Sequence, residues 1–166
     1  MPASVRSWRL PTAGHTAGLA GRFATAWRAA LTAGPRHPDR AWRVALSGEL
    51  GAGKTTWVRG FVAALGVDAP VASPSYALVQ TFEAGQQLIL HADFYRLQDA
   101  AELDALGLDD FDRADVLWLI EWPEHGAVRL GACDLQLSLA IEAGAHSLQA
   151  RAGTEDGARW LSQVLD

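Results

Sequence analysis

The stretch Gly48-Glu49-Leu50-Gly51-Ala52-Gly53-Lys54-Thr55 decides the fold that this sequence predicts. It matches the pattern G-x-x-x-x-G-K-[ST] at every fixed position. A run typical of a buried strand, residues 43–47, precedes it, and a run typical of a helix, residues 54–65, follows it. Glycines let backbone N–H groups point at phosphate oxygens, and the start of the helix adds the positive end of its dipole. The stretch therefore predicts a P-loop that binds a nucleoside triphosphate.

Two side chains of this loop have specific expected roles. We expect Lys54 to reach the β- and γ-phosphates and the Thr55 hydroxyl to bind Mg²⁺. The alternative is a glycine-rich turn that binds nothing, and it requires strand, motif and helix to coincide by chance. The other nucleotide contacts of the loop are expected from Glu49, Leu50, Gly51, Ala52, Gly53 and Thr56.

Two carboxylates are candidates for the acidic group that a P-loop enzyme needs beside Mg²⁺. Glu121 follows the most hydrophobic run of the chain, residues 114–120, where a lone acid has little structural reason to be. Asp93 ends the preceding strand-like run. Ligands of open α/β sheets lie at the carboxyl ends of the strands, so we expect both acids to converge there and to act in catalysis with Lys54. Glu121 could instead be a solvated strand end, and Asp93 could be a turn or cap residue.

Composition narrows the class of protein. The chain has 166 residues, which suits a single domain over 1–166, and its net charge of −5 argues against direct binding of nucleic acid. No uncharged apolar run approaches the ~18 residues that a membrane span needs. Cys133 is the only cysteine and no signal-peptide pattern opens the chain, so we expect a cytoplasmic protein. His and Cys residues lack metal-ligand spacing, so no zinc site is expected.

The order of the expected elements predicts a P-loop NTPase-like α/β fold with a mixed, mainly parallel central sheet flanked by helices. Alternating or continuous apolar runs indicate strands, and apolar residues at helical spacing indicate helices. Besides the P-loop unit, we expect a strand at 8–10, a helix at 16–31, a hairpin at 76–82 and 87–91, a short helix at 99–106, a central strand at 114–120, strands at 135–141 and 147–151, and a last helix at 154–165.

Ser73 and Ser75 flank Pro74 in a loop of short polar residues. A hydroxyl on such a loop can contact Mg²⁺ or the γ-phosphate as part of a switch, and a plain turn explains these residues equally well. The single P-loop without an Asn-Lys-x-Asp guanine signature favours ATP over GTP.

Together these motifs, in this order, resemble the bacterial TsaE (YjeE) family of P-loop ATPases. The resemblance covers about residues 10–141, and its set of motifs is much more specific than the P-loop alone. It rests on G-E-L-G-A-G-K-T-T at 48–56 with V-R-G at 58–60, S-P-S-Y-A-L-V at 73–79, H-A-D-F-Y-R-L at 91–97, E-L at 102–103 with L-G at 106–107, and I-E-W-P-E at 120–124.

The resemblance implies an Mg²⁺-dependent ATPase that is weak alone and is stimulated by its partners TsaB and TsaD. With them it would form threonylcarbamoyladenosine next to the anticodon of tRNA, and the partner complex would hold the tRNA, which suits the acidic chain. Carried over by position, the resemblance implies that Thr55 and Glu121 bind Mg²⁺ and that Lys54 clamps the phosphates. It likewise implies that Asp93 is needed for hydrolysis and that Trp122 supports the site.

The sequence departs from the family pattern near the expected base pocket and in the switch. Ser75 stands where Thr is commoner, and it keeps the hydroxyl. After Ile141 the family often carries Gly-Arg close to the adenine, whereas this chain has Gly144-Ala145-His146, so we expect His146 to stack on the base instead. Thr16 stands where the N-terminal segment of the family approaches the base, and facing solvent is the alternative for it.

Two other functions use the same residues. A small-molecule kinase would pass the γ-phosphate to an acceptor, but such enzymes usually carry an arginine-bearing lid, and only Arg129 lies between Glu121 and the strand at 135. A nucleotide-dependent interaction module would change its affinity for a partner on binding ATP, without obligatory hydrolysis. The sequence has no obvious arginine finger, which predicts slow hydrolysis in the absence of a partner.

Overall fold

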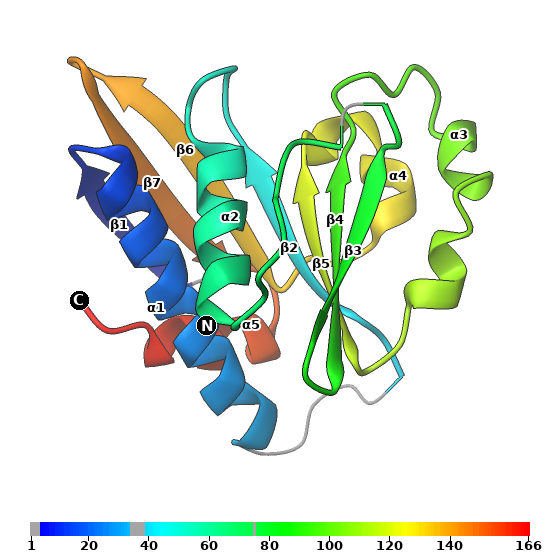
Figure 1. The fold of residues 1–166 in the computed structure, drawn as a ribbon, viewed down its shortest axis with the longest axis horizontal. Helices are drawn as coiled ribbons and strands as arrows, with labels where there is room; N and C mark the ends of the chain where they lie inside the picture. The colour runs from blue at the N-terminus through cyan, green and yellow to red at the C-terminus, as the bar shows by residue number, and fades with distance from the viewer. Residues whose placement is uncertain (1–3, 34–38, 75) are drawn as a thin grey trace.

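The computed structural model describes residues 4–33, 39–74 and 76–166. Within these residues the strands form one sheet, in the order β1-β7-β6-β2-β5-β4-β3 (Figure 1). The strands are β1 (Val5–Leu10), β2 (Trp42–Ser47), β3 (Val79–Ala84), β4 (Gln87–Asp93), β5 (Val116–Glu121), β6 (Leu135–Glu142) and β7 (Ala145–Ala152). The helices are α1 (Ala13–Thr32), α2 (Lys54–Ala64), α3 (Ala101–Asp104), α4 (Ala127–Leu130) and α5 (Glu155–Gln163), with 3₁₀ turns η1 (Leu108–Phe111) and η2 (Pro123–His125).

The centre of the sheet is parallel and both of its margins are antiparallel. Strands β6, β2, β5 and β4 are joined by parallel pairing. Strand β7 pairs antiparallel with both β1 and β6, and β3 pairs antiparallel with β4. The predicted mixed α/β fold flanked by helices is confirmed, and its parallel pairing is confined to the four central strands.

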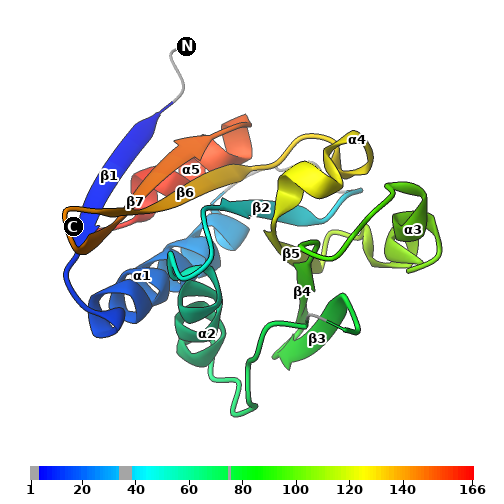
Figure 2. The same ribbon diagram turned by 90° about the horizontal axis from the view of Figure 1, so that it is seen from above.

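Helices on one face of the sheet form the larger of two hydrophobic cores. Helices α1, α2 and α5 enclose this core with the inward side chains of the strands, and Figure 2 shows α1 and α2 on the same side of the sheet. Trp160 of α5 lies in the middle of it, with its ring near Trp27, Trp42 and Phe61. Its indole N–H donates to the carbonyl of Phe23 at 2.9 Å, so the one polar atom of this side chain is satisfied inside the core.

The smaller core lies on the other face of β4 and β5. Leu90, Val116 and Trp118 contribute to it from the strands, and Leu103, Leu108 and Leu130 cover them from α3, η1 and α4. Strand β5 is buried along its whole length because it is covered on both faces. The two cores therefore hold the ends of β4 and β5 in fixed positions beside the P-loop.

Some predicted boundaries are wrong, and the late start of β3 has a local cause. The strand expected at 76–82 begins only at Val79, because Leu78 has a left-handed φ of 65° and its N–H donates to the carbonyl of Pro74. The helix expected at 99–106 ends at Asp104, although Glu102 does accept from the backbone N–H of Asp99 as the capping box predicts. The strands at the margins of a sheet have weaker patterns of apolar residues in the sequence than the central strands, because their side chains are less buried.

No helix among the described residues combines the length and apolar character that crossing a membrane requires.

Candidate nucleotide-binding site

The loop between β2 and α2 has the backbone conformation that its glycines permit. Gly48, Gly51 and Gly53 have φ angles of 148°, 80° and 105°. A Cβ at Gly48 would lie 2.4 Å from the carbonyl oxygen of Leu139, so only glycine fits where the loop crosses β6. Gly53 is the N-cap of α2, and the first residue of that helix is Lys54. The free N–H groups at the start of α2 therefore face the loop, as an anion site requires.

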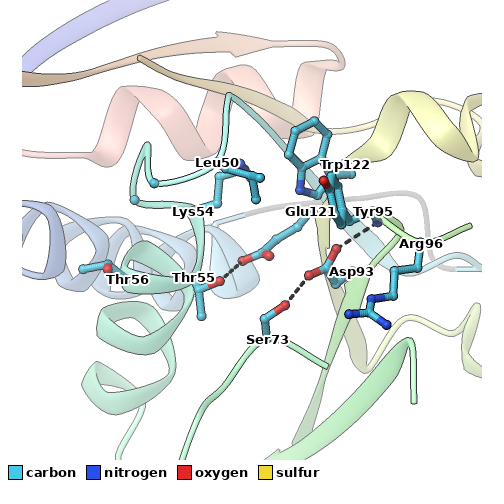
Figure 3. A pocket seen from close by; sticks show the side chains of 12 residues that line it. Leu50, Lys54, Thr55, Thr56, Ser73, Asp93, Tyr95, Arg96, Glu121 and Trp122 are labelled. Atoms are coloured by element: carbon cyan, nitrogen blue, oxygen red, sulfur yellow. Dashed lines mark hydrogen bonds between the residues drawn. The ribbon is translucent and has the colours of Figure 1, made fainter. Parts of the chain in front are cut away.

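A cavity of about 390 Å³ lies beside this loop. Its walls come from three places in the sequence: the P-loop with the start of α2, the segment after α2, and the carboxyl ends of β4 and β5 (Figure 3). The lining residues are Leu50, Gly51, Gly53, Lys54, Thr55, Thr56, Ser73, Asp93, Tyr95, Arg96, Glu121 and Trp122.

Lys54 is folded into the loop that precedes it. Its ammonium donates to the carbonyl oxygens of Gly48 and, at 2.9 Å, Glu49, and it lies 4.4 Å from the centre of the Trp122 ring. Burial lowers the pKa of Lys54, and the negative charges of Glu121 and Asp93 oppose that shift. The carbonyl groups are weak partners for a cation, so this ammonium can exchange them for phosphate oxygens.

Thr55 and Glu121 meet across the cavity. The Thr55 hydroxyl donates to Oε1 of Glu121 at 2.7 Å. Glu121 is only 2% exposed, and the fully buried His91 places its Nε2 3.5 Å from the same oxygen. A buried carboxylate with so few partners is costly unless it serves a ligand, because burial removes the water that would solvate it. The candidate Mg²⁺ ligands thus form one oxygen pair.

Asp93 lies directly beside Glu121, because the two residues are partners in the parallel pairing of β4 and β5. Its carboxylate accepts from the Ser73 hydroxyl and, at 2.9 Å, from the backbone N–H of Tyr95. Figure 3 shows Asp93 between Ser73 and Tyr95, with Glu121 on the side nearer Thr55. The two acids therefore lie side by side at the carboxyl ends of β4 and β5, as the sequence predicts.

Trp122 bends the chain away at the end of β5. Its φ of 55° is left-handed, which is unusual for a large side chain, and its N–H donates to the carbonyl of Leu46 at 3.3 Å. Its ring packs on those of Tyr95 and His125, with centroid distances of 4.9 and 5.7 Å. The strained backbone places the indole over Lys54, where it closes one side of the cavity.

His146 and Thr16 lie together at the other end of the P-loop. The ring Nδ1 of His146 is 3.0 Å from the carbonyl oxygen of Ala52. A Cβ at Gly53 would lie 3.5 Å from His146 Nδ1 and 3.8 Å from Thr16 Cγ2. Thr16 is 2% exposed, so the solvent-facing alternative for it is wrong. His146 belongs to β7, which lies on the opposite side of β2 from β4 and Asp93.

Comparisons with known proteins agree with this geometry. A family model described as "Threonylcarbamoyl adenosine biosynthesis protein TsaE" matches residues 10–151. The chain belongs to the TsaE family.

The TsaE protein of Haemophilus influenzae is 36% identical over 126 residues, which are 76% of this chain and 80% of that protein. The TsaE protein of Mycobacterium leprae is 40% identical over 105 residues, 58% of this chain and 65% of that protein. Both are named tRNA threonylcarbamoyladenosine biosynthesis proteins.

A solved structure has the same fold as this TsaE-family chain. The crystal structure of Bacillus subtilis YdiB superposes with a TM-score of 0.76 and 22% identity, covering 99% of this chain and 96% of that one. At that identity the likeness supports the fold alone. It extends beyond the residues on which the sequence resemblance rests, to β1, β7 and α5.

Some of the remaining predicted site residues line the cavity, and others do not. Leu50, Gly51, Gly53 and Thr56 line the cavity with Lys54 and Thr55. Ala52 is fully buried beneath the loop, and Glu49 is exposed and offers its carbonyl to Lys54. Ser75 lies outside the described residues, so its expected contact stays a prediction.

Sequence reasoning missed two residues that line the cavity, Tyr95 and Arg96. Both follow Asp93 in the stretch H-A-D-F-Y-R-L, so the signal was present in the motif. Both residues lie in the turn that follows β4, and this turn places them at the wall of the cavity.

Proposed function

We propose that this TsaE-family protein is a Mg²⁺-dependent ATPase subunit that is required to form threonylcarbamoyladenosine next to the anticodon of tRNA, together with TsaB and TsaD. The observation that carries the ATPase proposal is the pair formed by Thr55 and Glu121, 2.7 Å apart beside the P-loop lysine. The biosynthetic part is supported by family membership and by the names of the relatives.

The residues at the cavity suit Mg²⁺ rather than a softer metal. Thr55 and Glu121 offer oxygen atoms, and Mg²⁺ in nucleotide sites typically takes one or two protein oxygens, completing its shell with phosphate oxygens and water. Among the described residues no group of three or more His, Cys, Asp or Glu side chains could hold a metal by itself. This is the donor set of a metal that arrives with a nucleotide, and the ion would supply charge neutralisation at the β- and γ-phosphates.

The remaining chemistry falls to positioned side chains. In the proposed reaction a water oxygen bonds to the γ-phosphorus, the bond from that phosphorus to the β–γ bridging oxygen breaks, and ADP and inorganic phosphate are released. Lys54 and the N–H groups at the start of α2 hold the phosphates. Asp93, oriented by Ser73 and by the backbone of Tyr95, is the carboxylate that we expect to orient the attacking water.

The rest of the chain suits a subunit of a larger assembly. A net charge of −5 disfavours direct binding of tRNA, so we propose that the partners hold the tRNA. We further propose that residues 1–166 act as a single P-loop ATPase domain in the cytoplasm. Arg129, the one lid candidate of the kinase alternative, is ion-paired with Asp104 at 3.2 Å and does not line the cavity, which weakens that alternative.

The test is ATP hydrolysis by the purified chain, alone and with TsaB and TsaD, with Lys54→Ala as the blank. We expect slow hydrolysis alone, stimulation by the partners, and loss of both with Lys54→Ala, because that ammonium contacts the transferred phosphate. Thermal unfolding of the variant checks that it folds. Phosphate transfer to a small acceptor without stimulation would contradict the proposal and favour a kinase.

The interaction-module alternative needs a second measurement. Glu121→Gln removes one charge from the oxygen pair and keeps the shape of the side chain. We expect it to abolish both hydrolysis and tRNA modification in the reconstituted system. If ATP still binds and modification survives without hydrolysis, the protein acts as a nucleotide-dependent module.

A further inference from the structure

Arg96 is the residue of the cavity whose role nothing above explains. Among the described residues that line the cavity, Lys54 and Arg96 are the cations, and Asp93 and Glu121 are the anions. Lys54 already belongs to the P-loop motif. Arg96 belongs to no phosphate-binding motif, yet it lines the same cavity, and Figure 3 shows Thr56 and Arg96 at opposite sides of the view with Asp93 between them.

The backbone of Arg96 is held in place by its neighbours. Phe94 is fully buried and Leu97 is 7% exposed, and the N–H of Leu97 donates to the carbonyl of Phe94 at 3.0 Å. Tyr95 adds its stacking on Trp122 and its N–H bond to Asp93. Arg96 is thus carried on a tight turn between two core anchors, so its reach toward the cavity is set by the fold.

The guanidinium of Arg96 has only a weak contact at present. It lies 4.5 Å from the centre of the Tyr76 ring, and that tyrosine is 87% exposed. Within the described residues the guanidinium makes no ion pair. An exposed cation–π contact is much weaker than a charge-assisted pair with phosphate, so Arg96 can leave Tyr76 when an anion enters the cavity.

With its base beside His146, as the sequence predicts, a bound nucleotide would have its last phosphate on the side of Arg96. The P-loop and the start of α2 surround the β-phosphate in this motif, with the lysine between β and γ. Thr16 and His146 lie near Gly53 of the loop, and His146 belongs to β7, which is on the opposite side of β2 from β4 and Asp93. A triphosphate with its base near His146 therefore extends its γ-phosphate toward Asp93 and Arg96.

The side-chain charges of the cavity also favour a second cation there, in addition to the Mg²⁺ ion proposed at the β- and γ-phosphates. The γ-phosphate is the group that ATP has and ADP lacks, and it would enter a cavity that already holds the two carboxylates. Lys54 offers one compensating charge. The planar guanidinium fork of Arg96 can bind two oxygens of one phosphate at once, which a single ammonium cannot.

We propose that Arg96 binds the γ-phosphate of the nucleotide, leaving Tyr76 to do so, and thereby lets the site distinguish ATP from ADP. This inference rests on the proposed function, since it needs ATP in this cavity. The chain would then supply an arginine to the γ-phosphate from its own site, although its sequence shows no obvious arginine finger.

The test compares Arg96→Ala and Arg96→Lys with the wild type in binding of ADP and of the β,γ-imido analogue of ATP, measured by calorimetry with Mg²⁺. We expect Arg96→Ala to weaken the ATP analogue about tenfold or more and to leave ADP within about twofold, because only the former presents a γ-phosphate. Arg96→Lys keeps the charge without the fork and should fall between. Arg129→Ala, an exposed arginine outside the cavity, is the matched control and should change neither affinity.

The outcomes separate the two proposals. If Arg96→Ala loses the same affinity for both nucleotides, or loses none, the assignment of Arg96 is overturned. Hydrolysis of ATP by the wild type would still support the proposed function in that case. A wild type that binds neither nucleotide would overturn both. Tyr76→Ala should keep the preference for the ATP analogue, and loss of that preference would transfer the role from Arg96 to Tyr76.

Discussion

Thr55 and Glu121 show how the site depends on single side chains that are far apart in the sequence. They are 66 positions apart, one at the start of α2 and the other at the end of β5, yet they share a hydrogen bond. This hydrogen bond fixes the two oxygens relative to each other, which would prepare them for the proposed Mg²⁺ ion. Their individual roles cannot be separated by single substitutions, because removing either changes the position of its partner.

A double-mutant cycle tests this pair. We expect Thr55→Val and Glu121→Gln each to raise the Mg²⁺ concentration that gives half-maximal binding of the β,γ-imido analogue of ATP about tenfold or more, since each removes one proposed ligand. The double variant should be less impaired than the sum of the two single losses, because the residues act as a unit. Thr55→Ser keeps the hydroxyl and is the control. An unchanged Mg²⁺ dependence in either single variant would exclude that residue as a ligand.

At the scale of elements, the position of the P-loop depends on how closely α1 approaches α2. Gly60 of α2 faces Ala17 of α1, and a Cβ at Gly60 would lie 2.6 Å from the Cα of Ala17. Glycine at this position therefore reflects close packing of two helices rather than an unusual φ angle. The same contact holds α2, and with it Lys54 and Thr55, against the rest of the core.

Two glycine-to-alanine substitutions separate packing from helix propensity. Gly60→Ala forces the two helices apart, so we expect it to lower the free energy of unfolding by about 1–3 kcal/mol. Gly18→Ala in α1 meets nothing within 4 Å, so it should raise that free energy by about 0.5–1 kcal/mol through helix propensity alone. Chemical denaturation of both variants is the measurement. Equal changes would mean that the helix contact is looser than the structure shows.

The elements differ in how well the sequence predicts them. The P-loop unit and β5 were predicted closely, because a fixed motif and a continuous apolar run leave few alternatives. The start of β3 and the end of α3 were not, because the left-handed φ of Leu78 and the end of a single-turn helix leave no mark in the pattern of apolar residues.

For the molecule as a whole, Cys133 reports on the integrity of the fold. Burial raises the pKa of its thiol to about 11. The backbone at this residue is also closely packed, since a Cβ at Gly153 would lie 2.3 Å from the Cys133 carbonyl oxygen. Cys133 is half-buried, and its raised pKa makes the thiolate scarcer in the native protein than in the unfolded chain.

Thiol labelling tests this expectation. The change in pKa from 9.0 to about 11 lowers the thiolate fraction at pH 8 about 100-fold, so we expect native Cys133 to react about 100-fold more slowly than the denatured chain. The rate should rise with pH up to about 11 as the thiol ionises. Cys133→Ala is the blank. Equal rates in the native and denatured protein would mean that the region around β6 opens easily.

The sequence by itself determined the chemistry that the protein can carry out. The P-loop glycines, Lys54 and Thr55 are contiguous, and their function depends on local backbone conformation, so the motif and the family could be recognised without a structure. The acids Asp93 and Glu121 were also found, because each ends a buried run next to a parallel neighbour.

Only the tertiary structure decided which distant residues complete the site. The pairing of Thr55 with Glu121, the stacking of Trp122 over Lys54, the burial of Thr16 and the position of Arg96 at the cavity all depend on the order of the strands and on turns after them. The physical reason is that strand pairing and helix packing bring together residues whose sequence separation carries no signal of their contact. A local pattern reveals what a side chain can do, and the fold decides what it meets.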